Sequence, residues 1–201
     1  MKLVVATTNP GKLREIKSIL AGAPVELVGL EAFPQIPEPE ETGRTFAENA
    51  RLKALYYANA TGLPSVADDS GLEIAELGNA PGVHSARWYG TDYNVKFAKI
   101  YQRLQERGVA TSAARFVCHV ALAERGRIVH ETTGAIEGLI APTPKGTNGF
   151  GYDPIFYYPP FSATLAELDL DRKATVSHRG KAFLALRAYL VEEIAELEGG
   201  R

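Results

Sequence analysis

The feature that most constrains the fold is the run Ser-Val-Ala-Asp-Asp-Ser-Gly at residues 65–71. It predicts a short apolar strand that ends in two adjacent carboxylates. Side chains alternate across a strand, so Asp68 and Asp69 should point in different directions, where one can bind a cation while the other orients the strand end or a lysine. The same residue types are also typical of a turn, and this segment alone does not decide between the two interpretations.

Strand and helix patterns alternate along most of the chain. Runs of apolar and β-branched residues predict further strands at residues 3–7, 25–28, 114–123, 128–136 and 152–157. Apolar residues at helical spacing predict helices at residues 12–20, 45–60, 91–107, 165–170 and 182–197. Because some strands are joined by helices and two by a hairpin, we predict the α/β class, with a mixed sheet covered by helices and a single domain over residues 1–201.

Composition limits the classes of partner. The chain has 22 Lys and Arg against 24 Asp and Glu, so it carries no net positive field that would draw it onto nucleic acid. Cys118 is the only cysteine, which excludes an internal disulfide and a multi-cysteine zinc site and suits a reducing compartment. The apolar stretch after Lys2 ends at Thr7, too short for a signal peptide or a membrane span. We therefore expect a cytoplasmic protein that binds neither nucleic acid nor membrane.

A candidate phosphate site lies where the first predicted strand turns into a helix. The turn consists of Thr7, Thr8, Asn9, Pro10, Gly11 and Lys12. Backbone N–H groups at a helix N-terminus bind phosphate well, and hydroxyl, amide and ammonium groups stand beside them here. The spacing of glycines is not that of a Walker A loop, so P-loop ATPase chemistry is not indicated. An ordinary strand-to-helix turn is the alternative.

A candidate metal site combines Asp69 with the acidic loop before the second helix. Glu41 in that loop could share a cation with Asp69, and oxygen ligands of this kind suit Mg²⁺, which usually takes one or two carboxylates plus phosphate oxygens of a substrate. No histidine pair has the spacing of a zinc site. The alternative is that the acidic loop is simply solvated.

Two segments in the last third of the chain could recognise a purine base. Phe150 lies between Gly149 and Gly151, so backbone can approach a flat ligand closely while the ring stacks on it. A core phenylalanine in a glycine turn is the alternative. Lys173, together with the pair His178 and Arg179, supplies hydrogen-bond donors for a phosphate or a carbonyl oxygen of a base, although such a cluster can also be solvated surface.

Taken in order, these motifs resemble the inosine triphosphate pyrophosphatase family over nearly the whole chain. The matching positions are residues 7–12 with Glu15, 41–43, 45–46, 48–50 with Lys53, 68–72, 81–83, 85–87, 149–154 and 177–181. The resemblance implies an elongated central mixed sheet with two lobes around a nucleotide-binding cleft, usually in a homodimer. It also implies hydrolysis of ITP, dITP and XTP to the nucleoside monophosphate and pyrophosphate, which clears non-standard purines from the nucleotide pool.

The resemblance also implies roles for single residues. It makes Asp69 the proton acceptor and, with Glu41, a ligand of Mg²⁺. It assigns the triphosphate to Thr7, Thr8, Asn9, Pro10, Gly11, Lys12, Lys53 and Ser70. It assigns the base to Phe150, Gly151, Tyr152, Asp153, Lys173, His178 and Arg179. Two alternatives stay open at this point: a related Maf-type nucleotide pyrophosphatase, and a nucleotide-binding sensor that does not hydrolyse its ligand.

Overall fold

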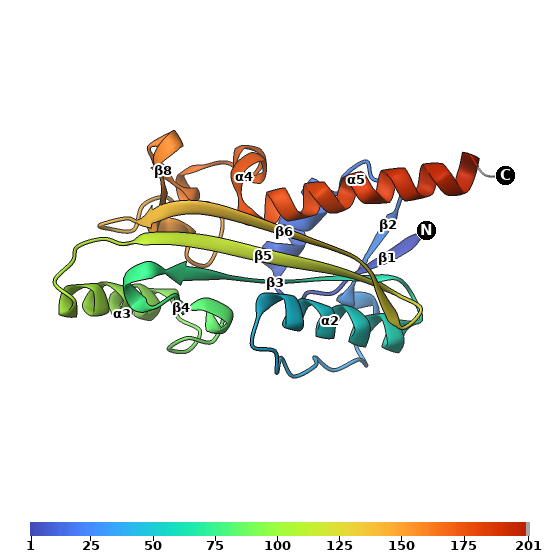
Figure 1. Cartoon of the computed structure of the whole chain (residues 1–201), viewed down its shortest axis with the longest axis horizontal. Helices are drawn as coiled ribbons and strands as arrows, with labels where there is room; N and C mark the ends of the chain where they lie inside the picture. The colour runs from blue at the N-terminus through green and yellow to red at the C-terminus, as the bar shows by residue number, and fades with distance from the viewer. Residues whose placement is uncertain (200–201) are drawn as a thin grey trace. The chain divides into compact units, whose positions relative to one another are not determined.

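The structure is a computed structural model of the chain, and it describes residues 1–199 except for the side chains of residue 194 and residues 196–199. The strands are β1 (Lys2–Val5), β2 (Glu26–Gly29), β3 (Ser65–Ile74), β4 (Ala80–Pro81), β5 (Ala113–Glu124), β6 (Arg127–Ile140), β7 (Phe156–Tyr158) and β8 (Ala163–Thr164). The α-helices are α1 (Pro10–Ile19), α2 (Phe46–Thr61), α3 (Tyr93–Glu106), α4 (Leu170–Val176) and α5 (His178–Gly199). Figure 1 shows their course along the chain.

The strands form one eight-stranded mixed sheet, which confirms the predicted α/β class. Their order is β2-β1-β3-β5-β6-β7-β8, and β4 pairs with β3. β1 runs parallel to both β2 and β3, whereas β4, β7 and β8 pair in antiparallel fashion. β5 and β6 are joined by the predicted hairpin through Arg125 and Gly126, whose φ angles of 50° and 75° both lie in the left-handed region that a tight two-residue turn requires.

The chain divides into two compact units. Unit 1 comprises Met1–Asp69, Cys118–Gly134 and Arg179–Arg201, and unit 2 comprises Ser70–Val117 and Ala135–His178. β3, β5 and β6 contribute residues to both units. The single domain predicted from the sequence stays a prediction.

Unit 1 packs helices against both faces of its strands. α2 and α5 lie on opposite sides of these strands (Figure 1). On the α2 side the core consists mainly of small side chains: Ala6, Ala50, Ala54, Tyr57, Ala58, Ala67, Ala121 and Ala123. Alanines on both surfaces let the helix axis approach the sheet closely, and this proximity brings polar residues of α2 within reach of the end of β3.

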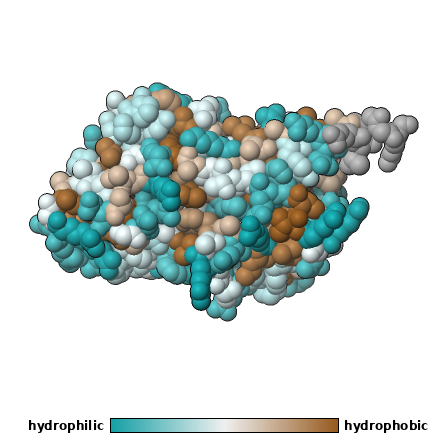
Figure 2. Space-filling model, in the orientation of Figure 1, coloured by the Kyte–Doolittle hydropathy of each residue, from teal (hydrophilic) through white to brown (hydrophobic). Residues whose placement is uncertain are grey.

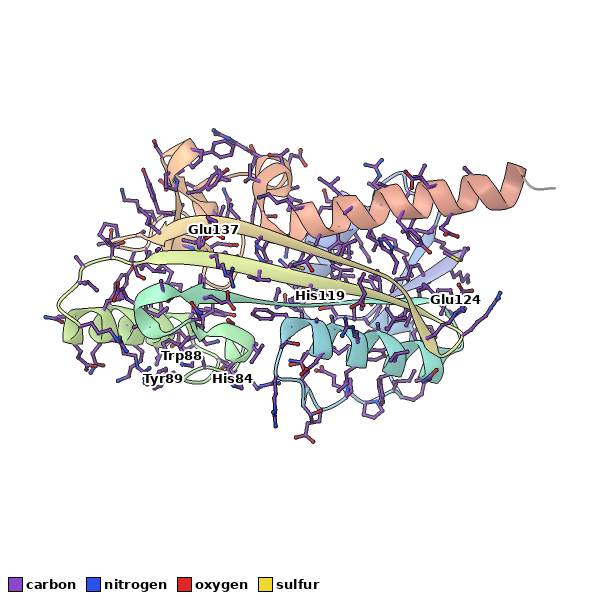
Figure 3. All side chains as sticks on the ribbon, in the orientation of Figure 1. His84, Trp88, Tyr89, His119, Glu124 and Glu137 are labelled. Carbon is purple, nitrogen blue, oxygen red and sulfur yellow. The ribbon has the colours of Figure 1, made fainter. Side chains whose placement is uncertain are left out.

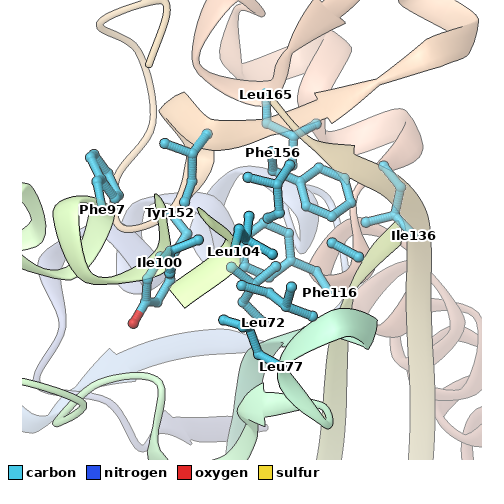
Figure 4. Close-up of a cluster of buried hydrophobic side chains, with 14 of the residues drawn as sticks. Leu72, Leu77, Phe97, Ile100, Leu104, Phe116, Ile136, Tyr152, Phe156 and Leu165 are labelled. Atoms are coloured by element: carbon cyan, nitrogen blue, oxygen red, sulfur yellow. The ribbon is translucent and has the colours of Figure 1, made fainter. Parts of the chain in front are cut away.

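Unit 2 has a core of larger side chains. Leu72, Ile100, Phe116, Ile136 and Phe156 come from five different elements and are buried together (Figure 4). On α3 the buried residues Phe97, Ile100 and Leu104 follow helical spacing, and on β5 buried residues alternate with more exposed ones from Ala113 to Val120, which explains the faces that these elements bury. This core supports the residues that the sequence analysis assigned to base recognition.

Three sequence predictions need correction. The final helix begins at His178 rather than at residue 182. The predicted strand at residues 152–157 is only Phe156–Tyr158, because Pro154 lies in a 3₁₀ turn over Asp153–Ile155. The helix predicted at residues 165–170 is instead a 3₁₀ turn over Leu165–Glu167, and α4 begins at Leu170, where the side chain of Asp169 accepts a hydrogen bond from Arg172 N at 2.7 Å.

The surface mixes polar and apolar residues. On the face drawn in Figure 2, hydrophobic residues occur in small groups between hydrophilic ones. Within the described part of the chain, no helix has the length and apolar character that crossing a membrane requires.

Candidate active site

The two carboxylates of β3 point to opposite faces of the strand, as its alternation predicts. Asp68 and Asp69 are 2% and 6% exposed, so each needs polar partners to offset its desolvation. Asp69 contacts residues of α2, whereas Asp68 contacts residues of α1 and α5. Residues 65–71 therefore belong to strand β3 and do not form the turn that was the alternative interpretation.

Asp69 is held by two residues one turn apart on α2. Asn49 Nδ2 donates a hydrogen bond to Asp69 Oδ2 at 3.0 Å, and Lys53 Nζ lies 3.5 Å from Asp69 Oδ1. The amide of Asn49 is oriented in turn by Gly43, whose backbone N–H donates to Asn49 Oδ1 at 2.8 Å. A Cβ on Gly43 would lie 2.5 Å from that oxygen, so this contact requires glycine.

Lys53 also links Asp69 to the acidic loop. Its Nζ lies 2.7 Å from Glu41 Oε1, so one ammonium contacts both carboxylates that the sequence analysis assigned to a metal. Burial disfavours the charged form of Lys53, but the surrounding Asp69, Asp68 and Glu41 outweigh it and raise its pKa. Burial raises the pKa of Asp69 and is only partly opposed by Lys53 and Lys12. A buried carboxylate with a raised pKa is a suitable general base.

Asp68 belongs to a buried ion-pair network on the other face. Lys12 Nζ lies 2.9 Å from Asp68 Oδ2, and Arg179 Nη2 lies 3.3 Å from the same oxygen. Arg179 Nη1 contacts Glu15 Oε2 at 2.7 Å. Burial alone would raise the pKa of Asp68, but Lys12 and Arg179 outweigh it and hold that pKa well below its ordinary value. Asp68 is therefore ionised at neutral pH.

The segment assigned to phosphate forms the start of α1. Thr8, Asn9 and Pro10 are exposed, and Gly11 and Lys12 are half-buried. Asn9 is the N-cap, because its Oδ1 accepts hydrogen bonds from Gly11 N at 2.9 Å and Lys12 N at 3.1 Å. Thr7 Oγ1 accepts from Asn9 N at 3.2 Å. The turn is thus preformed, with the side chain of Asn9 on two of the N–H groups predicted for phosphate.

The residues present fit a divalent cation with oxygen ligands. Glu41 and Asp69 already converge on a single positive atom, Lys53 Nζ, and both offer carboxylate oxygens, which Mg²⁺ prefers. Among the side chains that the structure describes, no group of three or more His, Cys, Asp or Glu converges as a metal site, so such an ion would take its other ligands from water or substrate.

In unit 2, the segment around Phe150 is organised by a buried ion pair. Lys173 Nζ lies 2.5 Å from Asp153 Oδ2 and 5.0 Å from the centre of the Phe150 ring. The same carboxylate oxygen accepts a hydrogen bond from Phe150 N at 2.8 Å. Gly149 has a φ of +72°, and a Cβ there would lie 2.2 Å from Asp153 Oδ2. Glycine is therefore needed both for the turn and for the close approach to the ion pair.

The other residues assigned to the base have defined surroundings in unit 2. Tyr152 is buried, and its hydroxyl donates to Ser85 O at 2.9 Å. The ring of His178 stacks on Phe116, with ring centres 4.6 Å apart and planes at 10°. Gly151 is half-buried, and so is Ser70, which the resemblance assigns to the triphosphate and not to the base. Unit 2 therefore brings together Phe150, Asp153 and Lys173, while unit 1 brings together Glu41, Lys53 and Asp69 with Lys12 and Arg179 on the opposite strand face.

Sequence reasoning gave no role to several residues that hold the site. Glu15 pairs with Arg179, and Lys12, Glu15 and Ile19 follow one another at helical spacing on the inward face of α1, a signal that could have identified Glu15 as buried. No such signal exists for Ser85 and Lys96, whose contacts depend on main-chain carbonyls. His119 on β5 (Figure 3) contacts Glu131 Oε1 and Thr133 Oγ1, each at 2.8 Å.

Comparisons with known proteins match almost the whole chain. A sequence profile of the Ham1 family matches residues 3–189. A protein named dITP/XTP pyrophosphatase from Geobacter sulfurreducens is 47% identical over 191 residues, which cover 94% of this chain and 96% of the relative. Another protein of that name, from Syntrophobacter fumaroxidans, is 50% identical over 187 residues, which cover 92% of this chain and 80% of that relative. The solved structure of a HAM1 protein from Coxiella burnetii is 41% identical, with a TM-score of 0.88, covering 96% of this chain and 99% of that one.

Proposed function

The chain belongs to the Ham1 family, and we propose that it hydrolyses the non-standard purine nucleoside triphosphates ITP, dITP and XTP to the nucleoside monophosphate and pyrophosphate. The resemblance to the inosine triphosphate pyrophosphatase family, predicted from the ordered motifs, is confirmed. The protein is a hydrolase acting on nucleoside triphosphates. The names of the relatives do not favour a Maf-type enzyme or a non-hydrolysing sensor.

The observation that carries this proposal is the arrangement around Asp69. A buried carboxylate with a raised pKa lies at hydrogen-bond distance from Asn49, and Lys53 connects it to Glu41. Hydrolysis of an α–β phosphoanhydride needs a base for the attacking water and positive charge for the leaving pyrophosphate. Asp69 supplies the base, and Lys53 and Lys12 supply positive charge on either face of the strand.

In the proposed reaction, Asp69 accepts a proton from a water molecule while the water oxygen forms a bond to the α-phosphorus. The bond from that phosphorus to the bridging oxygen breaks, and its electron pair leaves with pyrophosphate. Asn49 keeps the Asp69 carboxylate oriented toward the water, because its amide is itself fixed by Gly43. Lys12, Lys53 and the start of α1 stabilise the charge that accumulates on the leaving group. Thr7, Thr8, Asn9, Pro10, Gly11 and Ser70 complete the proposed triphosphate site.

We further propose that Glu41 and Asp69 hold Mg²⁺. The two carboxylates suit this ion, which would lower the pKa of the attacking water and neutralise phosphate charge. Activity should disappear in excess chelator and return with Mg²⁺. Unchanged turnover in chelator would overturn the metal assignment while leaving the role of Asp69 as a base.

Unit 2 is the proposed site of base recognition. Phe150 offers a stacking face, and Lys173 and His178 offer donors to a carbonyl oxygen at position 6 of a purine. Gly151, Tyr152 and Asp153 shape the proposed wall of this site, and the resemblance also assigns Arg179 to the base. A homodimer and a cytoplasmic location are also proposed. The lone, buried Cys118 is consistent with a reducing compartment, and light scattering of the purified protein would test the dimer.

The decisive experiment is incubation with each of ITP, XTP, GTP and ATP, with chromatography of the nucleotide product and a separate assay for pyrophosphate. The proposal requires equal amounts of nucleoside monophosphate and pyrophosphate from ITP and XTP. A nucleoside diphosphate with free phosphate would exclude cleavage between the α- and β-phosphates. Binding of ITP without any product would support the sensor instead.

A further inference from the structure

Lys96 is a fully buried lysine that lies outside the proposed catalytic machinery. It belongs to α3 and has a relative exposure of 0%. Its Nζ donates hydrogen bonds to Ser85 O at 3.0 Å and Ala86 O at 2.7 Å. The same atom lies 4.2 Å from the centre of the Tyr93 ring and 5.6 Å from that of Tyr152.

An ammonium in this position is costly to the folded protein. Among the side chains that the structure describes, no Asp or Glu forms an ion pair with Lys96, and its Nζ instead contacts two main-chain carbonyls and two aromatic faces. Removing a charge from water without a counter-ion is unfavourable, and burial accordingly lowers the pKa of Lys96. A methionine or leucine would fill the same space without this cost, so packing alone does not account for a lysine here.

The carbonyl of Ser85 connects Lys96 to the proposed base site. It accepts hydrogen bonds from both Lys96 Nζ and the Tyr152 hydroxyl, at 3.0 Å and 2.9 Å. Ser85 is itself fixed, because its Oγ accepts from Leu72 N at 2.9 Å and donates to Gly82 O at 2.6 Å. Lys96 and Ser85 thus form a rigid support to which the Tyr152 ring and hydroxyl are anchored.

Tyr152 passes this constraint to residues on both sides of it. It directly precedes Asp153, whose carboxylate contacts Lys173 and accepts the hydrogen bond of Phe150 N. Tyr93 adds a second contact, since its ring packs edge-on against that of Tyr152 at 5.2 Å. A shift of Tyr152 would therefore move the stacking residue and the ion pair together.

We propose that Lys96 is a positioning residue for purine recognition, which anchors Tyr152 through the Ser85 carbonyl and so fixes Phe150 and Asp153 relative to the base. The proposal rests on the proposed function. Lys96 itself touches neither the base nor the phosphates, and its effect should appear in nucleotide binding rather than in the chemical step.

The kinetic test compares Lys96→Met with Lys99→Met, the same change at a half-buried lysine of the same helix whose Nζ contacts Gln102 Oε1 instead of Ser85. Lys96→Met should raise KM for ITP about tenfold with little change in kcat, since two anchoring hydrogen bonds are lost. Inhibition by inorganic tripolyphosphate, which has no base, should stay within about twofold of wild type. Lys99→Met should behave as wild type in both assays. An unchanged KM for ITP, or an equal weakening of tripolyphosphate, would overturn the proposal.

Amide hydrogen exchange gives a second readout that does not need activity. The Phe150 N–H, which donates to Asp153, should exchange about tenfold faster in Lys96→Met but not in Lys99→Met. Tyr152→Phe removes only the hydroxyl that reaches Ser85 and should reproduce both effects, whereas Tyr101→Phe, which removes a hydroxyl bonded to Ala141 O, should not. If the wild type fails to hydrolyse ITP, the proposed function is wrong, but the exchange rates still show whether Lys96 anchors Tyr152. Unchanged exchange of the Phe150 N–H in both Lys96→Met and Tyr152→Phe would refute this anchoring role.

Discussion

Asp68 and Asp69 are neighbours in the chain, yet strand geometry gives them different partners and different electrostatic states. Lys12 and Arg179 surround Asp68 and lower its pKa, whereas burial with fewer cations raises the pKa of Asp69. The first arrangement suits a permanent charge and the second suits proton transfer. The sequence predicted that the two carboxylates diverge, but only the structure shows which cations each one meets.

Asp69→Asn should leave the fold intact and remove most of the turnover. Asparagine keeps the size of the side chain but cannot accept the proton of the attacking water. A general base typically contributes about 10²–10⁴-fold to the rate, so kcat for ITP should fall by at least that factor. Pyrophosphate release would be measured beside circular dichroism of the same sample. Near-normal turnover in a folded variant would exclude Asp69 as the base.

Asp68→Asn should instead act on stability. It leaves the buried Arg179 and the half-buried Lys12 without this carboxylate, and breaking a buried ion pair costs about 3–5 kcal/mol. Glu26→Gln, which breaks the exposed pair with Lys2, should cost at most about 1 kcal/mol. Urea unfolding at neutral pH would give both values. Equal losses of unfolding free energy in the two variants would show that the buried ion pairs of Asp68 stabilise the fold no more than an exposed pair does.

The same network predicts how stability depends on pH. The pKa of Asp68 in the folded protein lies below its ordinary value of 3.8, so its ion pairs stabilise fully above that value. The contribution is lost as the pH falls below 3.8 toward the folded pKa. Unfolding free energy should therefore fall less steeply below that pH in Asp68→Asn than in wild type. Parallel curves in this range would contradict the assignment.

Lys53 occupies the space between the proposed metal ligands, so metal binding should displace it. Lys53→Met removes a positive charge beside Glu41 and Asp69 and should tighten Mn²⁺ binding, measured without nucleotide by electron paramagnetic resonance, at least about fivefold. Arg51→Met removes a charge from the same helix, where Arg51 pairs with Glu131, and should have little effect. Weaker Mn²⁺ binding in Lys53→Met would mean that Lys53 organises the carboxylates instead of competing with the ion.

At the scale of secondary-structure elements, local sequence signals predicted most of the fold. Thr45 caps α2 at the predicted start of that helix, because its Oγ1 accepts from Glu48 N at 3.1 Å. The Glu48 carboxylate accepts from Arg44 N rather than Thr45 N, so the Thr-x-x-Glu sequence at residues 45–48 forms only half of a capping box. Errors arose where tertiary contacts override local pattern. α5 begins at His178, whose stacking on Phe116 is a long-range contact that spacing along the chain cannot reveal.

The loop that carries Phe150 gives a prediction at this scale. Gly149→Ala adds strain at a φ of +72° and also forces a Cβ onto Asp153 Oδ2, 2.2 Å away. Gly78→Ala is the matched control, because its φ is +65° and nothing lies within 4 Å of its Cβ. Strained backbone costs about 1–3 kcal/mol, so both variants should lose stability, but only Gly149→Ala should also raise KM for ITP. Equal KM values in the two variants would remove this loop from the proposed base site.

At the scale of the whole molecule, the site residues come from segments far apart in the sequence. Arg179 and Glu15 are 164 residues apart and meet at 2.7 Å, and Lys173 and Asp153 meet across 20 residues. Residue types and motif order predicted which residues to consider, because phosphate, metal and base each require a particular chemistry. Which of these residues form ion pairs could not be predicted from the sequence. The contact between Arg179 and Glu15 depends on how α1 and α5 pack within unit 1, and that between Lys173 and Asp153 depends on the packing of unit 2.

The net charge of the whole chain would not attract a highly charged anion such as a triphosphate. The formal net charge is −2, so attraction of a triphosphate must come from local cations. In unit 1, Lys12 and Lys53 lie next to the carboxylates of β3. These carboxylates hold both lysines in place, so a triphosphate bound at the proposed site would require little reorganisation of them.

Selectivity for the base is tested with whole nucleoside triphosphates. We expect ITP and XTP to be far better substrates than ATP. Lys173 and His178 are donors, which pair with a carbonyl at position 6 but leave a donor unpaired against the amino group of adenine. Sites built around a required hydrogen bond can discriminate by about 10⁴-fold, whereas apolar fit alone gives about 10- to 200-fold.

His178→Phe keeps a ring stacked on Phe116 and removes both ring nitrogens. It should therefore lower the ratio of kcat/KM for ITP over ATP at least about tenfold while the protein stays folded. GTP shares the 6-oxo group, so its turnover isolates the effect of the 2-amino group. If the wild type hydrolyses ATP as well as ITP, donors in this cluster do not select the base.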